Sequence, residues 1–191
     1  MIKIVYAGLL GVAQDIKSLI QGIDFKKLDA ELHLYGGGNQ KEDIKGYIAR
    51  CPDRGVFFHG YVEPTELREV LKQYDAALIP LATYIKGAVP SKIFDTLPLG
   101  LPILFCGDGE GAEIVRKYQV GFVSPPNDEK GLRDNILRLS QMTEQDRKMI
   151  GEREKKVARE EFDFEKQMDK CHQFIKGLVY AEYEKNIISK Q

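Results

Sequence analysis

Strand-like and helix-like segments alternate along almost the whole chain, and this alternation limits the folds open to it. Strand-like runs occur at IKIVYAG, ELHLYGGG, GVFFHGYV, DAALIPL, LPILFCG and VGFVSPP. Segments with helical spacing separate them, and the first places Ile16, Leu19, Ile20 and Ile23 on one face. Short connections between alternating elements predict a parallel sheet covered by helices on both faces. We therefore expect an α/β fold with three layers.

The last third of the chain predicts helices only. Residues 127–141 and 143–161 have helical spacing, and the run REKKVAREE within the second is expected to be a solvated helix face. From Phe162 a long charged helix with a broken apolar stripe follows. We therefore predict one α/β domain over residues 1–161 and a separate C-terminal helix over residues 162–191.

Composition excludes several classes of protein. A net charge of −1 gives no general attraction to nucleic acid or to an anionic membrane. Three scattered cysteines argue against a disulfide framework and fit a reducing compartment. No apolar run approaches the roughly 20 residues that span a bilayer, and MIKIVYAG is typical of a strand rather than a signal peptide. The expected location is the cytoplasm.

In parallel sheets ligands bind beyond the carboxyl ends of the strands, so the loops after the strands are the places to search. The first, AGLLGVAQD, has Gly8 and Gly11, which would let a phosphate approach backbone N–H groups; a tight turn that needs positive φ is the favoured alternative. The second, YGGGNQ, offers bare backbone for a base or sugar, or is a flexible turn. The third, HGYVEPTEL, exposes backbone groups at Tyr61 and Val62 that could pair with a base edge, or is a plain connector.

The fourth loop carries the strongest signal. Ser91 and Lys92 stand at a helix start, where a hydroxyl, an ammonium and the positive helix end together favour an anion such as phosphate. Asp95 lies one turn deeper on the same face, suited to accept from ribose hydroxyls. The alternative is a capping serine with two surface charges. Pro98 is expected to limit this helix because it removes a backbone hydrogen bond.

The fifth loop, CGDGEGAE, adds carboxylates that could bind sugar hydroxyls. Glu113 is better explained as a first-turn acid that suits the helix dipole, while Glu110 remains open to either role. Three separated histidines, His33, His59 and His172, show no metal-ligand spacing, and we expect them to be structural or solvent-facing. We expect Cys106 to be a small buried hydrophobe. The sequence predicts no metal site and no nucleophile–base pair.

The loops, in this order, resemble the C-terminal, nucleotide-sugar-binding half of group 1, family 4-like, retaining glycosyltransferases. The likeness runs through VYAGLLGVAQDIKSLIQGI, LHLYGGGNQ, VFFHGYVEPTELREVLKQYDAALIPL and VPSKIFDTLPLGLPILFCGDGEGAEIVRKYQVGFVSPPND, and its most specific part is PSKIFD followed by LGLPI. It is similar to the variant in enzymes that build capsule, O-antigen or exopolysaccharide units. The resemblance implies a Rossmann-like domain, one half of a GT-B fold, with the last helix crossing back toward an N-terminal domain.

The resemblance also implies roles for individual residues. Ser91 and Lys92 would hold the diphosphate, Lys92 as the catalytic residue, and Asp95 would bind the ribose. The remaining nucleotide-sugar contacts would come from Gly11 beside the diphosphate, from Gly36, Gly37, Tyr61 and Val62 around the base, and from Glu110 near the sugar. Two departures stand out: Gly87 replaces the first acid of the family's Glu-x7-Glu pair, and the usual Arg and Lys pair on the diphosphate is not evident.

The function implied is transfer of a sugar from a UDP- or GDP-sugar to a lipid-linked or saccharide acceptor, without a metal or other cofactor. The partner would be an N-terminal acceptor-binding domain or chain, without which we expect nucleotide binding but no turnover. Any membrane contact, at the inner face of the plasma membrane, would come through that half. Two alternatives stay open: a non-catalytic nucleotide-binding subunit or module, and a fragment of a nucleotide-sugar epimerase.

Overall fold

Six parallel strands form one sheet in the computed structural model, which describes residues 1–83 and 86–188. Their order across the sheet is β3-β2-β1-β4-β5-β6, and every neighbouring pair is parallel. The bounds are β1 Ile2–Leu9, β2 Ala30–Gly37, β3 Val56–Gly60, β4 Ala76–Pro80, β5 Ile103–Cys106 and β6 Gly121–Ser124. All six predicted strands are therefore confirmed. Two positions of the fourth loop, 84–85, and residues 189–191 of the tail lie outside the described residues.

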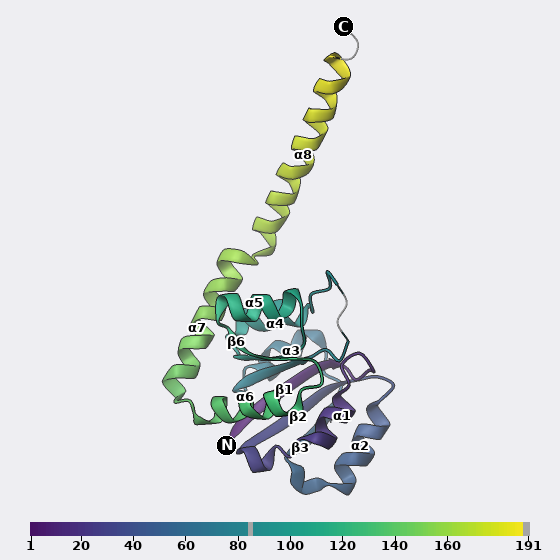
Figure 1. Ribbon diagram of the computed structural model, residues 1–191, viewed down its shortest axis with the longest axis vertical. Helices are drawn as coiled ribbons and strands as arrows, with labels where there is room; N and C mark the ends of the chain where they lie inside the picture. The colour runs from purple at the N-terminus through teal and green to yellow at the C-terminus, as the bar shows by residue number, and fades with distance from the viewer. Residues whose placement is uncertain (84–85, 189–191) are drawn as a thin grey trace.

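Helices cover both faces of the sheet (Figure 1), which confirms the three-layer α/β prediction. The α-helices are α1 Ile16–Gly22, α2 Lys41–Arg50, α3 Pro64–Leu71, α4 Lys92–Thr96, α5 Glu110–Tyr118, α6 Glu129–Gln141, α7 Glu144–Glu161 and α8 Phe164–Ile188. Short 3-10 turns are η1 Lys26–Leu28, η2 Pro52–Arg54 and η3 Leu97–Leu99. Pro98 lies in η3, so the helix it was expected to limit does end at Thr96.

The core lies in two layers, one on each side of the sheet. Alternate residues of β1 divide between them: Ile4 and Tyr6 join the cluster formed with α1, α2 and α6, whereas Val5 joins a cluster with α3. Residues of α4, α5 and α7 build a third cluster over β4 and β5. Because a strand exposes successive side chains on opposite faces, a central strand covered on both sides is apolar throughout.

The order of the strands reverses between β1 and β4. The chain moves from β1 outward to β2 and β3, returns to β4 beside β1, and then proceeds outward to β5 and β6. The loops that follow β1 and β4 therefore diverge toward opposite faces, and a crevice opens beyond the strand ends. The loops after β1, β2 and β3 and the start of α4 meet at this crevice.

Helix α7 packs against η3, and the contact is close because both sides carry glycine. A Cβ added to Gly151 would come within 2.6 Å of the Gly100 carbonyl oxygen. The expectation of a solvated face for REKKVAREE is wrong at Glu154 and Val157, which are buried. Glu154 is fully buried and neither of its carboxylate oxygens has a hydrogen-bond partner. Burial therefore raises the pKa of Glu154 well above its usual range.

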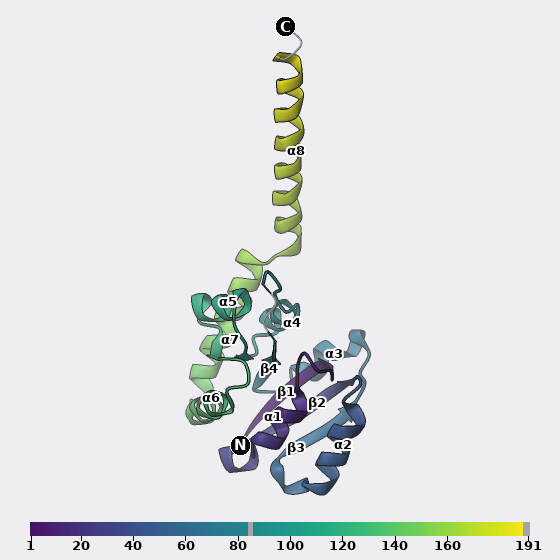
Figure 2. The same cartoon turned by 45° about the vertical axis from the view of Figure 1, so that its right-hand side comes forward.

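Helix α8 extends away from the α/β domain (Figures 1 and 2). Its described part exposes several apolar side chains, namely Phe164, Met168, Phe174, Ile175 and Leu178. The separate C-terminal helix is thus present, while its crossing to another domain stays a prediction. None of the described helices combines the length and the apolar character that crossing a membrane requires.

Candidate functional site

A cavity of about 510 Å³ opens at the point where the strand order reverses. Four segments line it: the end of β1, the end of β2, the start of α3 with the residues before it, and the start of α4. Seven of the nine residues predicted from sequence line this cavity, namely Gly36, Gly37, Tyr61, Val62, Ser91, Lys92 and Asp95. Residues that are more than fifty positions apart in sequence are therefore brought to one place by the topology.

Two predicted residues lie elsewhere. Gly11 does not line the cavity; its carbonyl accepts hydrogen bonds from the backbone N–H groups of Gln14 and Asp15, which makes it part of the turn into α1. Glu110 begins α5 outside the cavity, with one carboxylate oxygen buried and without a partner. The role of Glu110 as a replacement for the acid that is absent at Gly87 therefore stays a prediction.

Lys92 is the charged group at the centre of the site. Its side chain crosses from α4 to the end of β1, where Cε occupies space 2.4 Å from the position that a Cβ on Gly8 would take. The side chain is half-buried, and it makes no ion pair with any carboxylate in the described part of the chain. Burial lowers the pKa of Lys92, and the nearby charge of Asp95 opposes that shift.

Helix α4 contributes less to the site than the sequence suggests. It has only five residues, so few aligned peptide dipoles stand behind its first turn. Ser91 occupies the N-cap position, but its side chain makes no capping hydrogen bond, which contradicts the interpretation of Ser91 as a capping residue. The Ser91 and Asp95 side chains are both exposed beside Lys92. The positive charge at the cavity is therefore carried mainly by the lysine.

The three consecutive glycines at the end of β2 have two different roles. A Cβ on Gly36 would lie 1.9 Å from the Gly8 carbonyl oxygen, and one on Gly38 would lie 2.4 Å from that of Leu10. These two positions allow the first and second loops to touch, and the Leu10 N–H donates to the Gly37 carbonyl at 2.8 Å. A Cβ on Gly37, in contrast, would meet no atom within 4 Å. Gly37 thus leaves bare backbone facing the cavity.

Tyr35 also lines the cavity, and sequence reasoning missed it. Its hydroxyl lies 2.7 Å from that of Tyr74, and its ring stacks on His59 with centroids 4.7 Å apart. His59 in turn lies 2.8 Å from His33 between ring nitrogens, so these two histidines form a pair across β2 and β3. The two histidines thus contact each other, and their structural or solvent-facing role stays a prediction. The available signal for Tyr35 was its place directly before the glycine run.

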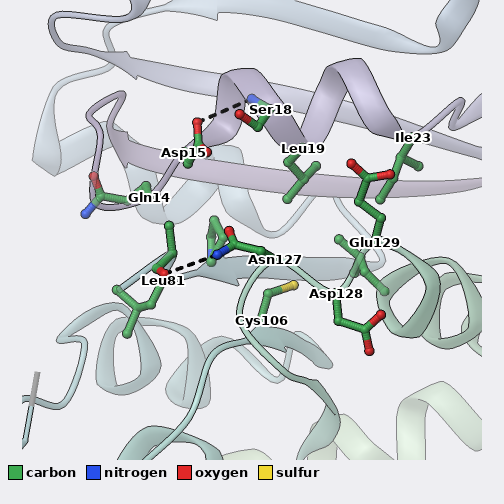
Figure 3. A pocket seen from close by; sticks show the side chains of 13 residues that line it. Gln14, Asp15, Ser18, Leu19, Ile23, Leu81, Cys106, Asn127, Asp128 and Glu129 are labelled. Atoms are coloured by element: carbon green, nitrogen blue, oxygen red, sulfur yellow. Dashed lines mark hydrogen bonds between the residues drawn. The ribbon is translucent and has the colours of Figure 1, made fainter. Parts of the chain in front are cut away.

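A second, smaller cavity of about 70 Å³ lies on the other side of the first loop. Figure 3 shows Asp15 and Ser18 of the α1 region on one side of it, and Cys106 and Asn127 on the other. The Asn127 side-chain amide donates to the Ala82 carbonyl at 3.4 Å, and burial raises the pKa of the Cys106 thiol to about 12. A space this small holds a few waters rather than a nucleotide, and its buried thiol stays protonated.

No group of three or more metal-binding side chains is arranged to hold an ion within residues 1–83 and 86–188. The site as described therefore offers a cation, a hydroxyl, a carboxylate and open backbone, next to an aromatic and aliphatic wall. Such a combination suits a ligand with an anionic group at one end and a flat, partly apolar group at the other.

Comparison with known proteins agrees with the fold described above. The model of the family described as "Glycosyl transferases group 1" matches residues 2–142. TarM from S. aureus, in a structure with UDP, has a TM-score of 0.76 at 18% identity over 90% of this chain and 34% of its own. HepE from Anabaena, in complex with UDP-glucose, has a TM-score of 0.76 at 16% identity over 92% of this chain and 49% of its own.

A solved structure of similar size also matches. It is the C-terminal domain of the group 1 glycosyl transferase family protein LpcC from Francisella tularensis, with a TM-score of 0.70 at 14% identity, over 85% of this chain and 87% of its own. The chain thus spans about a third of TarM and about half of HepE, but most of an isolated C-terminal domain. No curated protein sequence matches the chain.

Proposed function

The chain belongs to the group 1 glycosyltransferases, and from that premise we propose that it is the donor-binding half of an enzyme that transfers a sugar from a nucleoside diphosphate sugar. The observation that carries the proposal is the half-buried Lys92 ammonium, which has no ion-pair partner among the described residues and faces the cavity at the strand-order reversal. A desolvated charge without a partner is unfavourable, so an anionic ligand would provide the negative charge that the protein does not place beside Lys92.

The remaining lining residues fit the other parts of such a donor. Ser91 would donate to the diphosphate, and Asp95 would accept from the ribose hydroxyls one helical turn away. Gly36, Gly37, Tyr61 and Val62 would border the base. Two structural neighbours contain UDP or UDP-glucose, which favours a uridine donor over a guanosine donor. During transfer the C1–O bond to the diphosphate breaks, and Lys92 would stabilise the charge that develops on the departing diphosphate.

Transfer would require a second half. The chain spans 34% of TarM and 49% of HepE, so acceptor binding and the opposite wall of a catalytic cleft would come from an N-terminal domain or chain. The acceptor is proposed to be a lipid-linked or saccharide molecule, and capsule, O-antigen or exopolysaccharide synthesis is the proposed setting. The chain alone is expected to bind the nucleotide without turnover, in the cytoplasm.

The test is calorimetric titration of UDP into the chain and into the Lys92→Gln variant. A charge-assisted hydrogen bond contributes about 1.5–3 kcal/mol, so we expect the variant to bind UDP roughly 10-fold to 150-fold more weakly. Lys148→Gln is the matched control, because Lys148 lies exposed on α7 and outside the cavity-lining residues. Equal affinity in all three proteins, or no UDP binding by the unmodified chain, would refute the proposal.

Gly87 supports a second candidate, a nucleotide-binding module without catalytic activity. Gly87 has a positive φ of 79°, and a Cβ there would meet no atom within 4 Å. The surrounding space would admit the family's acid, but the backbone conformation at this position favours glycine. Transfer assays with and without a candidate N-terminal half separate the two: transfer that depends on the partner favours the enzyme, and binding without transfer favours the module. Interconversion of free UDP-sugars would instead indicate an epimerase.

A further inference from the structure

Tyr6 is a core residue that lies next to Lys92 of the proposed diphosphate site. It is fully buried near the end of β1, in the core cluster that includes α1 and α2. Its hydroxyl donates to the carbonyl of Leu9, which is the last residue of β1 and lines the cavity. The hydroxyl therefore fixes the backbone at the start of the first loop, whereas a phenylalanine would fill the same core without this bond.

The side chain of Lys92 lies over the same tyrosine. Its Nζ is 5.7 Å from the centroid of the Tyr6 ring, within the range of a cation–π interaction. Gly8 lies between them: the position of a Cβ on Gly8 would be 2.7 Å from Lys92 Nζ and 3.6 Å from the Tyr6 hydroxyl oxygen. The ammonium, the phenol and the glycine backbone thus converge at one corner of the cavity.

An aromatic ring holds an ammonium in a way that a carboxylate does not. A carboxylate at contact distance would neutralise the charge and compete with an incoming phosphate. The ring attracts the cation through its quadrupole but carries no net charge, so the cation remains available. Asp95 is the carboxylate whose charge acts on Lys92, and it forms no ion pair with it at 4.0 Å or less.

We propose that Tyr6 is a positioning residue for the diphosphate site: its ring holds the Lys92 ammonium at the end of β1, and its hydroxyl fixes the loop against which that ammonium lies. The proposal rests on the proposed function, because it assigns Lys92 an anionic ligand. It goes further in naming a core residue that acts on the ligand without touching it.

The first test measures the position of Lys92 without any nucleotide. In protein with 13C-labelled lysine, the ε-methylene resonance of Lys92 is assigned from its loss in Lys92→Arg. A ring beneath the ammonium shifts this resonance upfield from those of exposed lysines. We expect Tyr6→Phe, which keeps the ring, to retain the shift, and Tyr6→Leu to lose it. An unshifted resonance in the unmodified protein, or a shift that survives in Tyr6→Leu, would overturn the proposal.

The second test asks whether the ring acts on the ligand through Lys92. UDP affinity is measured by chemical-shift titration for Tyr6→Leu, alone and combined with Lys92→Gln. We expect Tyr6→Leu alone to weaken binding about threefold to tenfold, the range of a partly desolvated cation–π contact. In the Lys92→Gln background the same change should alter affinity less than about twofold.

A general loss of folding gives a different pattern from a positioning role. If Tyr6→Leu weakens UDP binding equally in both backgrounds, the residue acts through the core alone and the proposal is wrong. Tyr6→Phe, which avoids a large cavity, should weaken binding less than Tyr6→Leu does. If the unmodified chain does not bind UDP at all, the proposed function fails, and the resonance of Lys92 still decides whether Tyr6 positions it.

Discussion

Lys92 and Glu154 are both ionisable side chains withdrawn from water without an ion-pair or hydrogen-bond partner among the described residues, yet their surroundings differ. Lys92 stands at the edge of a cavity of about 510 Å³, beside bare glycine backbone. Glu154 is sealed on α7, which packs against η3, and is 0% exposed. Burial lowers the pKa of Lys92 and raises that of Glu154, so each shift disfavours the charged form.

The difference shows which unpaired groups point to a ligand. A carboxyl that is sealed from water avoids the cost of a buried charge by keeping its proton, and the protein then holds a neutral polar group in its core. A cation at a cavity can instead be satisfied by an anion from solution. An unpaired ionisable group is therefore evidence for binding only when open space adjoins it.

The largest expected effect concerns the backbone that keeps the cavity open. Gly36→Ala would place a Cβ 1.9 Å from the Gly8 carbonyl oxygen, at a residue whose φ is +129°. Neither the backbone clash nor the strained φ can be relieved by a side-chain movement. We expect unfolding free energy to fall by about 3 kcal/mol or more, measured by urea denaturation, together with loss of UDP binding.

Gly37→Ala is the matched control in the same run of glycines. Its Cβ would meet no atom within 4 Å, and its φ is not positive. We expect its stability to stay within about 0.5 kcal/mol of the unmodified chain. If the two variants unfold at the same urea concentration, the close contact between the first and second loops does not hold the site together as described.

An effect of intermediate size on stability is expected at the buried carboxyl of Glu154. The folded state holds the Glu154 proton more tightly than the unfolded state, whose pKa is about 4.3. The contribution of Glu154 to the free energy of unfolding is therefore fully present below the pKa of the unfolded state. It is lost as pH rises toward the raised pKa of the folded state. The slope in that window is about 1.4 kcal/mol per pH unit. Glutamine cannot ionise, so between pH 5 and pH 8 the unfolding free energy of Glu154→Gln should fall less than that of the unmodified chain, as measured by urea denaturation.

Glu152→Gln is the control on the same helix. Glu152 is exposed beside Lys155, whose ammonium lowers the pKa of its carboxyl. A lowered pKa moves its titration further from the range between pH 5 and pH 8, so this variant should follow the unmodified chain there. Parallel pH profiles for all three proteins would mean that Glu154 is not sealed from water.

The sequence predicts the fold well because the fold depends on patterns that are local. Six apolar runs with glycine or proline at or near their ends, separated by segments with helical spacing, are enough to predict six strands in a parallel sheet. Glu154 shows the limit of such patterns. Among the charged residues of REKKVAREE it resembles its neighbours, and only the contact of Gly151 with Gly100 brings that face of α7 into the core.

Site residues that are neighbours in sequence could be predicted, whereas residues that only the fold brings together could not. Ser91, Lys92 and Asp95 stand within five positions of each other, and the glycine run is visible at once. Tyr6 appears as one more apolar residue in a buried strand, because nothing in β1 indicates that a lysine 86 positions later will lie over its ring. Glu110 lies beside a glycine-rich loop in sequence but not among the residues that line the cavity, so its contact with the sugar stays a prediction.

The smallest expected effect concerns the charge of Lys92 at the cavity. UDP binding is expected to require the ammonium form, so affinity should fall as pH rises through the pKa of Lys92. Asp95 raises that pKa against the effect of burial. Asp95→Asn removes this opposing influence, and the midpoint of the affinity loss should move to lower pH. Titrations of UDP between about pH 8 and pH 11 measure it, with Asp134→Asn on the exposed side of α6 as the control. A midpoint that stays in place, or moves to higher pH, would show that Lys92 is not the group whose charge UDP requires.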